Sequence, residues 1–358
     1  MSTDAKPIAA ALLAAAGVAV AIALGSLGFV HFDAALIGYA IGSALAASAV
    51  AYRFVVWAQR PPSRMYFKRG LQLLFHRVGE TTSGPPAAAP SGRTPHGVGT
   101  LGHALARNFV AQEFIRQRSA YRWIMHLCLS GGCTLAFAIT FPLVFGWIHF
   151  ESLADNAETY RVVAFGVAVD RFSIHSLKAT LAFNALNLAG VIVLVGLVMA
   201  AIRRLTDAGE RATQTFFEDI LPLLLIFAVT ATGLALTVSY KFLGGRGHGL
   251  WALVHMVSVV GLLLFIPFGK LFHMFQRTCS LCVSRYKKVG EAGPRAHCRS
   301  CGEDFASQMH VDDLKTVLDQ LGFNYRFAGA RGEIHYQEIC PACRRRLLAL
   351  NQGRTVGR

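Results

Sequence analysis

The sequence predicts an all-α polytopic membrane protein with six transmembrane helices, followed by a small cysteine-rich, metal-binding cytoplasmic domain. Two observations lead to this fold class. Hydrophobic residues make up 54% of the 358 residues, and the mean hydropathy of +0.44 is well above that of a soluble protein of this length. Three C-x-x-C pairs, a spacing typical of metal sites, follow the last long apolar stretch.

Six apolar stretches are long enough to cross a bilayer as helices. They are roughly Ile8–Val30, Ala34–Trp57, Tyr121–His149, Thr180–Ile202, Ile220–Phe242 and Trp251–Met274. The second stretch follows the first after a short turn, so we expect a retained hairpin rather than a cleaved signal peptide. The predicted domains are this hairpin (residues 1–59), a basic cytoplasmic loop (60–120), a helical domain (121–277) and a cysteine-rich domain (278–358).

The net charge of +15 is distributed as in a membrane protein rather than as in a nucleic-acid-binding protein. Arginine and lysine are concentrated between residues 53 and 120 and again after Arg277, whereas Glu151–Lys178 and Lys241–Gly249 are balanced or short of cations. The positive-inside rule then places both termini and the long loop in the cytoplasm. We therefore expect a multi-pass protein of the inner (cytoplasmic) membrane, in contact with lipid and without a nucleic-acid partner.

The basic loop divides into three predicted parts. Arg64–Arg77 mixes basic and apolar residues at helical spacing, which is typical of a helix on the anionic leaflet or beneath a partner subunit. Gly79–Thr100 has the composition of a flexible linker, and Leu101–Ala120 is predicted to be a second interfacial helix. The alternative is that the cations of this loop serve only to fix the topology.

Four histidines lie near the ends of the third and sixth predicted spans. His255 and His273 are eighteen residues apart, which is five turns or about 27 Å on a straight helix, so both imidazoles would share one face. The third span offers His126 at its cytoplasmic start and His149 at its outer end. Because the two spans run antiparallel, His126 should lie level with His273, and His149 with His255. Ionisable groups inside a membrane are usually functional, and histidine is an axial haem ligand, so we predict two haem b groups.

The outer pair is the less regular one. His126 and His149 are twenty-three residues apart, about 140° out of phase on a straight helix, although Pro142 between them could kink it. His175, just before the fourth span, is the competing outer ligand. Asn184 and Asn187 in the fourth span could bind a quinone or tie helices together, and Gly131 and Gly132 could admit a flat macrocycle or a close helix neighbour.

Two segments carry a family resemblance: Arg122-Trp-Ile-Met-His126, and Pro267-Phe-Gly-Lys-Leu-Phe-His273. They resemble the inner-haem elements of the membrane cytochrome b (gamma) subunit of respiratory nitrate reductases, and of the membrane subunits of heterodisulfide reductases and sulfite-reductase-linked complexes. The resemblance implies a dihaem subunit that passes electrons between menaquinone or ubiquinone and a cytoplasmic iron–sulfur or catalytic oxidoreductase subunit. In that family a second histidine follows the first by ten residues; here Ala136 stands there, so His149 would have to supply the ligand.

The tail carries a four-cysteine site. Cys298 and Cys301 form one C-x-x-C pair and Cys340 and Cys343 another, and two such pairs complete a tetrahedral site. The tail resembles a rubredoxin-like domain or a zinc ribbon, with a helix around Val311–Leu321 between the pairs. Zinc and iron both remain open, because Arg344 replaces the glycine expected after the second pair.

The third pair, Cys279 and Cys282, is compatible with a further metal site completed by a residue such as His297, or with free thiols. Other functions also fit the sequence as a whole. The chain could be a transporter or a proton or metal relay that uses intramembrane histidines, or a membrane anchor whose zinc ribbon recruits partners. As an electron carrier it would be a subunit of a larger oxidoreductase rather than a complete enzyme.

Overall fold

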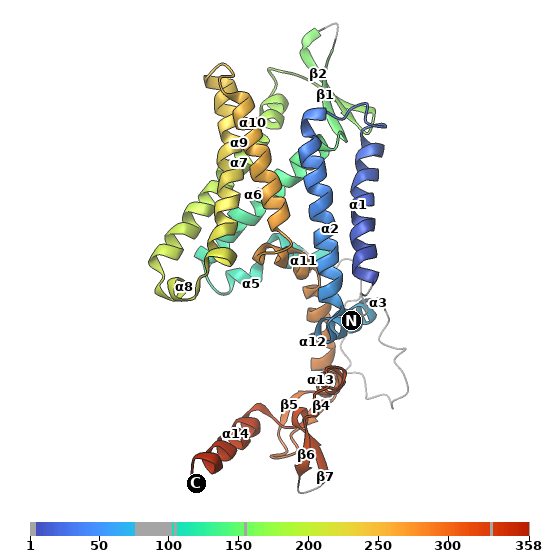
Figure 1. Ribbon diagram of the computed structural model, residues 1–358, viewed down its shortest axis with the longest axis vertical. Helices are drawn as coiled ribbons and strands as arrows, with labels where there is room; N and C mark the ends of the chain where they lie inside the picture. Colours follow the sequence, from blue (N-terminus) through green and yellow to red (C-terminus); the bar gives the residue numbers. More distant parts are fainter. Residues whose placement is uncertain (1–4, 76–101, 104–105, 154–155, 330–331, 358) are drawn as a thin grey trace. The chain divides into compact units, whose positions relative to one another are not determined.

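The structure is a computed structural model that describes residues 5–75, 102–103, 106–153, 156–329 and 332–357. The chain forms two compact units (Figure 1). Residues 1–55 and 101–274 make up the first, here called the membrane unit, and residues 56–100 and 275–358 make up the second, here called the cysteine-rich unit.

Within the described residues, six helices are long and apolar enough to cross a membrane. They are α1 (Ala5–Gly25), α2 (Ile37–Gln59, preceded by η1, Ala34–Leu36), α6 (Ala120–Val144), α7 (Leu177–Thr206), α9 (Leu221–Phe242, preceded by η3, Phe216–Ile220) and α10 (His248–Phe265). Much of their apolar side-chain surface is exposed, as expected of helices that face lipid. The predicted fold class is confirmed: the protein is a mostly helical, multi-pass membrane protein.

The third predicted span is five residues too long. Helix α6 ends at Val144, where Gly146 takes a left-handed conformation (φ 71°) that terminates the helix. The chain then enters an antiparallel sheet of β1 (Ile148–Leu153), β2 (Asn156–Ala164) and β3 (Val167–Ser173). His149 therefore lies on β1, opposite Val163, and not on the third helix as predicted.

The sixth predicted span is not one continuous helix. Helix α10 ends at Phe265, and a turn leads to η4 (Lys270–Phe272) and to the short helix α11 (His273–Thr278). Pro267 explains the break, because proline lacks the backbone N–H that a helix needs and its ring clashes with the preceding turn. The expectation that His255 and His273 share one face of a straight helix is therefore wrong.

Small residues let the helices of the membrane unit approach closely. A Cβ added at Gly132 of α6 would lie 2.6 Å from Cγ2 of Val193 and 3.1 Å from the Ala189 carbonyl of α7, whereas one added at Gly131 would meet nothing within 4 Å. Val193 belongs to the buried core that includes Ile226 and Leu262. Of the two glycines, Gly132 thus has the helix-packing role.

The N-terminal hairpin packs on the other helices of the same unit. Trp147, between α6 and the sheet, covers Gly25 at the end of α1 and donates its indole N–H to the Ala21 carbonyl at 2.8 Å. Helix α2 approaches α10 through Gly42, where an added Cβ would lie 3.0 Å from a methyl group of Val260. The hairpin is thus an integral part of the membrane unit.

The cysteine-rich unit combines helices with two small hairpins. Its elements are α3 (Pro61–Phe75), α12 (Ser280–Ala292), β4 (Arg295–His297), β5 (Asp304–Ser307), α13 (Gln308–Gln320), β6 (Arg326–Gly329), β7 (Gly332–His335) and α14 (Pro341–Val356). Strands β4 and β5 pair antiparallel, as do β6 and β7. The helix predicted around Val311–Leu321 is α13.

The three predicted parts of the basic loop agree with the structure to different extents. Of the segment Arg64–Arg77, residues 64–75 form most of α3, and the last two residues lie outside the described part of the chain. Helix α3 packs on α12 so closely that a Cβ added at Gly70 would lie 2.3 Å from Cβ of Cys282. The linker predicted at Gly79–Thr100 lies outside the described residues. Leu101–Ala120 is not one helix: it contains η2 (Ala106–Val110) and α5 (Glu113–Arg116), separated by Gln112 in a left-handed conformation (φ 49°).

Candidate functional site

His126 lies in the second turn of α6 and is held by a side chain that precedes the helix. Its Nδ1 is 2.6 Å from Oε1 of Gln112, whose amide nitrogen donates to the Ser130 hydroxyl at 2.8 Å. That hydroxyl donates to the His126 carbonyl at 2.7 Å, so it accepts from the amide and the amide orientation is fixed. Because an amide oxygen only accepts, Nδ1 of His126 is the donor of this hydrogen bond.

His273 and His255 show the same arrangement. Nδ1 of His273 donates to the Lys270 carbonyl at 2.6 Å. Nδ1 of His255 is 2.9 Å from the Thr232 hydroxyl, which donates to the Ala228 carbonyl at 2.6 Å and therefore accepts from the imidazole. A hydrogen bond from one ring nitrogen that leaves the other nitrogen basic is the usual arrangement of a metal-ligating histidine.

His126 and His273 lie at the same end of the membrane unit. A series of ion pairs links the start of α6 to the turn before α11: Arg122 with Asp207 (4.0 Å), Arg204 with Asp219 (3.6 Å) and Lys270 with Asp219 (2.8 Å). Both histidines are half-buried. Their common level agrees with the predicted pairing, although the ligand role of either residue stays a prediction.

His255 lines a cavity of about 470 Å³ inside the membrane unit, between α2, α6, α7, α9 and α10. From α6 the wall includes Cys133, Ala136, Phe137 and Thr140. The cavity is mostly apolar with a few polar groups and has the size of typical cofactor sites. Ala136, which stands where the resembling family has its second histidine, is thus part of this wall.

The structure places His149 and His175 elsewhere, and neither lines the cavity. The His149 ring stacks on that of His31 with centroids 4.1 Å apart, and its Nε2 lies 3.2 Å from a carboxylate oxygen of Glu151. His175 is exposed, 3.9 Å from Glu158. His31, in the turn between α1 and α2, was not predicted to have a role. The sequence feature that could have indicated one is the presence of a polar residue in a very short connection between two apolar stretches.

The two asparagines of α7 form hydrogen bonds that join this helix to α9. Thr237 of α9 donates to Oδ1 of Asn187 at 2.8 Å, and Lys241 of α9 donates to Oδ1 of Asn184 at 2.8 Å. Asn187 also lines the cavity. Of the two roles that the sequence allowed, the structure shows the tie directly.

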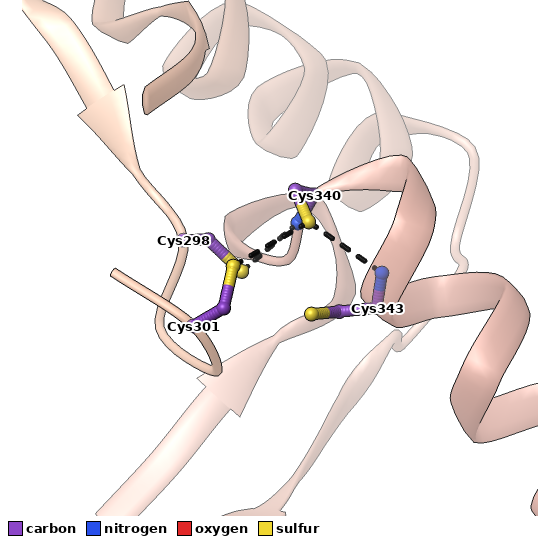
Figure 2. A group of neighbouring side chains, drawn as sticks. All are labelled: Cys298, Cys301, Cys340 and Cys343. Carbon is purple, nitrogen blue, oxygen red and sulfur yellow. Dashed lines mark hydrogen bonds between the residues drawn. The ribbon is translucent and has the colours of Figure 1, made fainter. Parts of the chain in front are cut away.

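Four cysteines converge in the cysteine-rich unit (Figure 2). The sulfur atoms of Cys298, Cys301, Cys340 and Cys343 lie within 4.8 Å of one another, and those of Cys301 and Cys340 are 3.8 Å apart. A tetrahedron with metal–sulfur bonds of about 2.3 Å has edges of about 3.8 Å. The cluster can therefore hold one zinc or iron ion.

The two C-x-x-C pairs reach the cluster differently. Cys298 follows β4, and after Cys301 the chain turns at Gly302 (φ 81°), whose N–H donates to the Cys298 carbonyl at 2.8 Å. Cys340 caps α14, with Pro341 in its first turn, and Cys343 lies within the helix. This explains Arg344, because a residue inside a helix does not need the left-handed conformation that favours glycine.

Backbone N–H groups point at the sulfur atoms. Cys340 N–H donates to Sγ of Cys298 at 3.2 Å, and Cys343 N–H donates to Sγ of Cys340 at 3.5 Å. Burial by itself would raise the pKa of Cys298, but backbone N–H groups of Cys340, Cys301 and Ser300 outweigh it and lower this pKa to about 6. Cys298 is thus favoured as a thiolate, the form that binds a metal, whereas hydrogen bonds with the neighbouring thiols raise the pKa of Cys301. Cys301 is the exposed member of the four.

Cys279 and Cys282 belong to no group of metal-ligating side chains among the described residues. Both are buried at the start of α12, and burial raises the pKa of both thiols. His297, which could have joined them, is ion-paired with Asp304 on the neighbouring strand. They are free thiols in this structure.

No family model matches the chain, and no solved structure matches it. The chain is similar to a subunit of the dihydromethanophenazine:CoB–CoM heterodisulfide reductase of Methanosarcina thermophila. The two are 24% identical over 207 residues, which cover 54% of this chain and 70% of that relative.

Proposed function

We propose that this chain is a haem-bearing membrane subunit of an oxidoreductase complex in the inner (cytoplasmic) membrane. It passes electrons between a quinone, menaquinone or ubiquinone, in the bilayer and a cytoplasmic iron–sulfur or catalytic subunit. Its similarity to a heterodisulfide reductase subunit supports this class of function, since that relative is part of an oxidoreductase. Both termini and the cysteine-rich unit are on the cytoplasmic side in this proposal.

The observation that carries the proposal is the shared hydrogen-bonding state of three histidines. His126, His255 and His273 each bond an oxygen through Nδ1, which is the usual arrangement of an imidazole that ligates a metal through Nε2. A purely structural role would not explain why all three histidines share this hydrogen-bonding state. The donor set fits haem b, which supplies one-electron redox chemistry when bound.

We assign His126 and His273 to one haem, here called the inner haem. Gln112 and the Lys270 carbonyl fix the ring orientation of these two proposed ligands. Hydrogen bonds to axial imidazoles and burial are the means by which a protein sets a haem potential.

We assign His255 to a second, outer haem in the cavity. Thr232 orients the imidazole, and Gly233 lies under it: a Cβ there would come within 3.1 Å of Cε1. His149 remains the predicted fourth ligand, although it lies on β1 and outside the cavity lining. Its substitution is therefore the decisive test of that ligand.

The four-cysteine centre holds one metal ion in this proposal. Iron there would relay electrons towards the cytoplasmic partner, and zinc would stabilise the fold. Iron and zinc are distinguished by metal analysis of the purified full-length chain together with its visible absorption.

The test is a reduced-minus-oxidised absorption spectrum of the full chain in detergent, with haem counted per polypeptide. We expect a b-type signal from two haems. His126→Ala and His273→Ala should each remove the same haem, and His255→Ala and His149→Ala the other. His248→Ala, at the exposed start of α10, is the matched control and should keep both. A wild-type chain without haem would overturn the proposal and leave the transporter or relay function.

A further inference from the structure

The turn that follows α10 carries His273 and is unusually well buried for a break between helices. Pro267 is less than 2% exposed and Phe272 is 2% exposed. The proline ends the regular hydrogen bonding of α10, so the carbonyl groups of this turn need partners from elsewhere. Arg53 supplies one such partner, and Asp219 binds the side chain of Lys270 in the same turn.

Arg53 of α2 holds the turn from one side. Its guanidinium donates to the Pro267 carbonyl, and it lies over the Phe272 ring with the guanidinium carbon 4.5 Å from the ring centroid. A planar guanidinium suits both contacts at once, and a lysine ammonium cannot reproduce the stacking. Phe272 immediately precedes His273, so this contact fixes the backbone from which the imidazole projects.

Asp219, just before α9, holds the turn from another side. Its carboxylate binds Nζ of Lys270 at 2.8 Å and also pairs with Arg204 of α7 at 3.6 Å. The Asp219 side chain is 12% exposed, whereas that of Lys270 is 55% exposed, so the carboxylate is the anchored partner of the pair. The carbonyl of the same Lys270 accepts the hydrogen bond of His273 Nδ1, so the ion pair acts on the group that sets the ring orientation.

We infer that Arg53 and Asp219 are positioning residues for the inner haem: together they fix the turn and thereby aim Nε2 of His273. The inference rests on the proposed function, since it concerns a ligand of that haem. It gives α2 an indirect part in the proposed electron-transfer site. Neither residue touches the haem in this account; each acts through the backbone of the turn.

The test compares Arg53→Met, Arg53→Lys and Asp219→Asn with wild type in the full-length chain. Arg60→Met, an exposed arginine near the end of α2, is the matched control. The readouts are the potential of each haem by redox titration and the g-values of each low-spin ferric haem by electron paramagnetic resonance. The haem that His273→Ala removes defines the inner one.

We expect both Arg53 variants and Asp219→Asn to shift the potential and g-values of the inner haem and leave those of the outer haem unchanged. Arg53→Met added to His273→Ala should not alter the remaining haem. Selective loss of the inner haem from a monodisperse Arg53→Met protein would also support the inference. If that variant does not fold, Arg53→Lys and Asp219→Asn decide.

Inner-haem signals in all three variants that equal those of wild type and Arg60→Met would overturn the positioning role, as would equal shifts of both haems. Either result would leave the proposed function standing. By contrast, a wild-type chain that binds no haem would overturn the proposed function itself.

Discussion

Replacing Asp313 by alanine should destabilise the cysteine-rich unit by about 2 kcal/mol. The carboxylate of this buried residue of α13 accepts a hydrogen bond from the Tyr286 hydroxyl of α12 at 2.8 Å. It also accepts one from Nε of Arg69 of α3 at 3.2 Å. One carboxylate thus joins three helices.

The Tyr286 bond contributes most of this energy. Tyr286 is 2% exposed, so its hydroxyl has no water to replace the lost acceptor. A hydrogen bond to a charged group contributes about 1.5–3 kcal/mol. The Arg69 side chain is 47% exposed, so its ion pair adds less than about 1 kcal/mol. Burial, and then Asp313, raise the pKa of Tyr286, so the phenol stays protonated and remains the donor.

The assay is thiol labelling of Cys279 and Cys282, which are 7% and 5% exposed, in the full-length chain, with mass spectrometry to identify the modified residues. A loss of about 2 kcal/mol raises the population of the open state, and hence the labelling rate, about thirtyfold. Tyr286→Phe should give most of the same acceleration and add little to Asp313→Ala. Asp312→Asn, an exposed neighbour, is the control. Labelling of Asp313→Ala at the wild-type or control rate would refute this reasoning.

Three further predictions concern packing, pH and the metal centre. Gly132→Leu should prevent close packing of α6 on α7 and abolish a monodisperse peak in size-exclusion chromatography, whereas Gly131→Leu should not, because only Gly132 has neighbours within 4 Å. Burial lowers the pKa of His310 below its ordinary 6.5, so below that pH the unfolded chain binds a proton that the folded chain resists. The unfolding temperature of the cysteine-rich unit should therefore fall as pH drops from 7 to 5.5, and fall less in His310→Gln. Cys301→Ser should lower the metal content and make α14 protease-sensitive but leave the rest of the cysteine-rich unit protease-resistant. Cys298→Ser should lower the metal content and make the whole unit protease-sensitive, because Cys301 is exposed and Cys298 is in the core.

Hydropathy was sufficient to predict the number of spans, since a bilayer imposes length and composition on every crossing helix. It was not sufficient for their ends. The apolar residues Phe145, Trp147 and Ile148 continue past the end of α6, and the positive φ of Gly146 separates helix from strand there. For α10, Pro267 was visible in the sequence, but a proline predicts a break or a kink without deciding between them.

The four-cysteine cluster follows from spacing alone, because a tetrahedral metal demands two close pairs. The hydrogen-bond partners of the histidines cannot be predicted from spacing in this way. Gln112 reaches His126 because it interrupts a helical segment in a left-handed conformation, and no local pattern encodes that contact. The sequence does not distinguish Arg53 from the other cations that determine topology, because its contact with the Pro267 carbonyl is formed only in the folded chain.

The start of α14 has a practical consequence for anyone who produces this protein. Cys340 and Cys343 lie at its first turn, Leu347 packs on the small core beside them, and the residues beyond are exposed up to the end of the described chain. An ion held by the four cysteines would tether α14 to the rest of the unit, so cultures starved of zinc and iron should yield material with a loose, protease-sensitive carboxyl end. The recovery of protein with a C-terminal purification tag would then depend on the metal supply as well as on the expression yield.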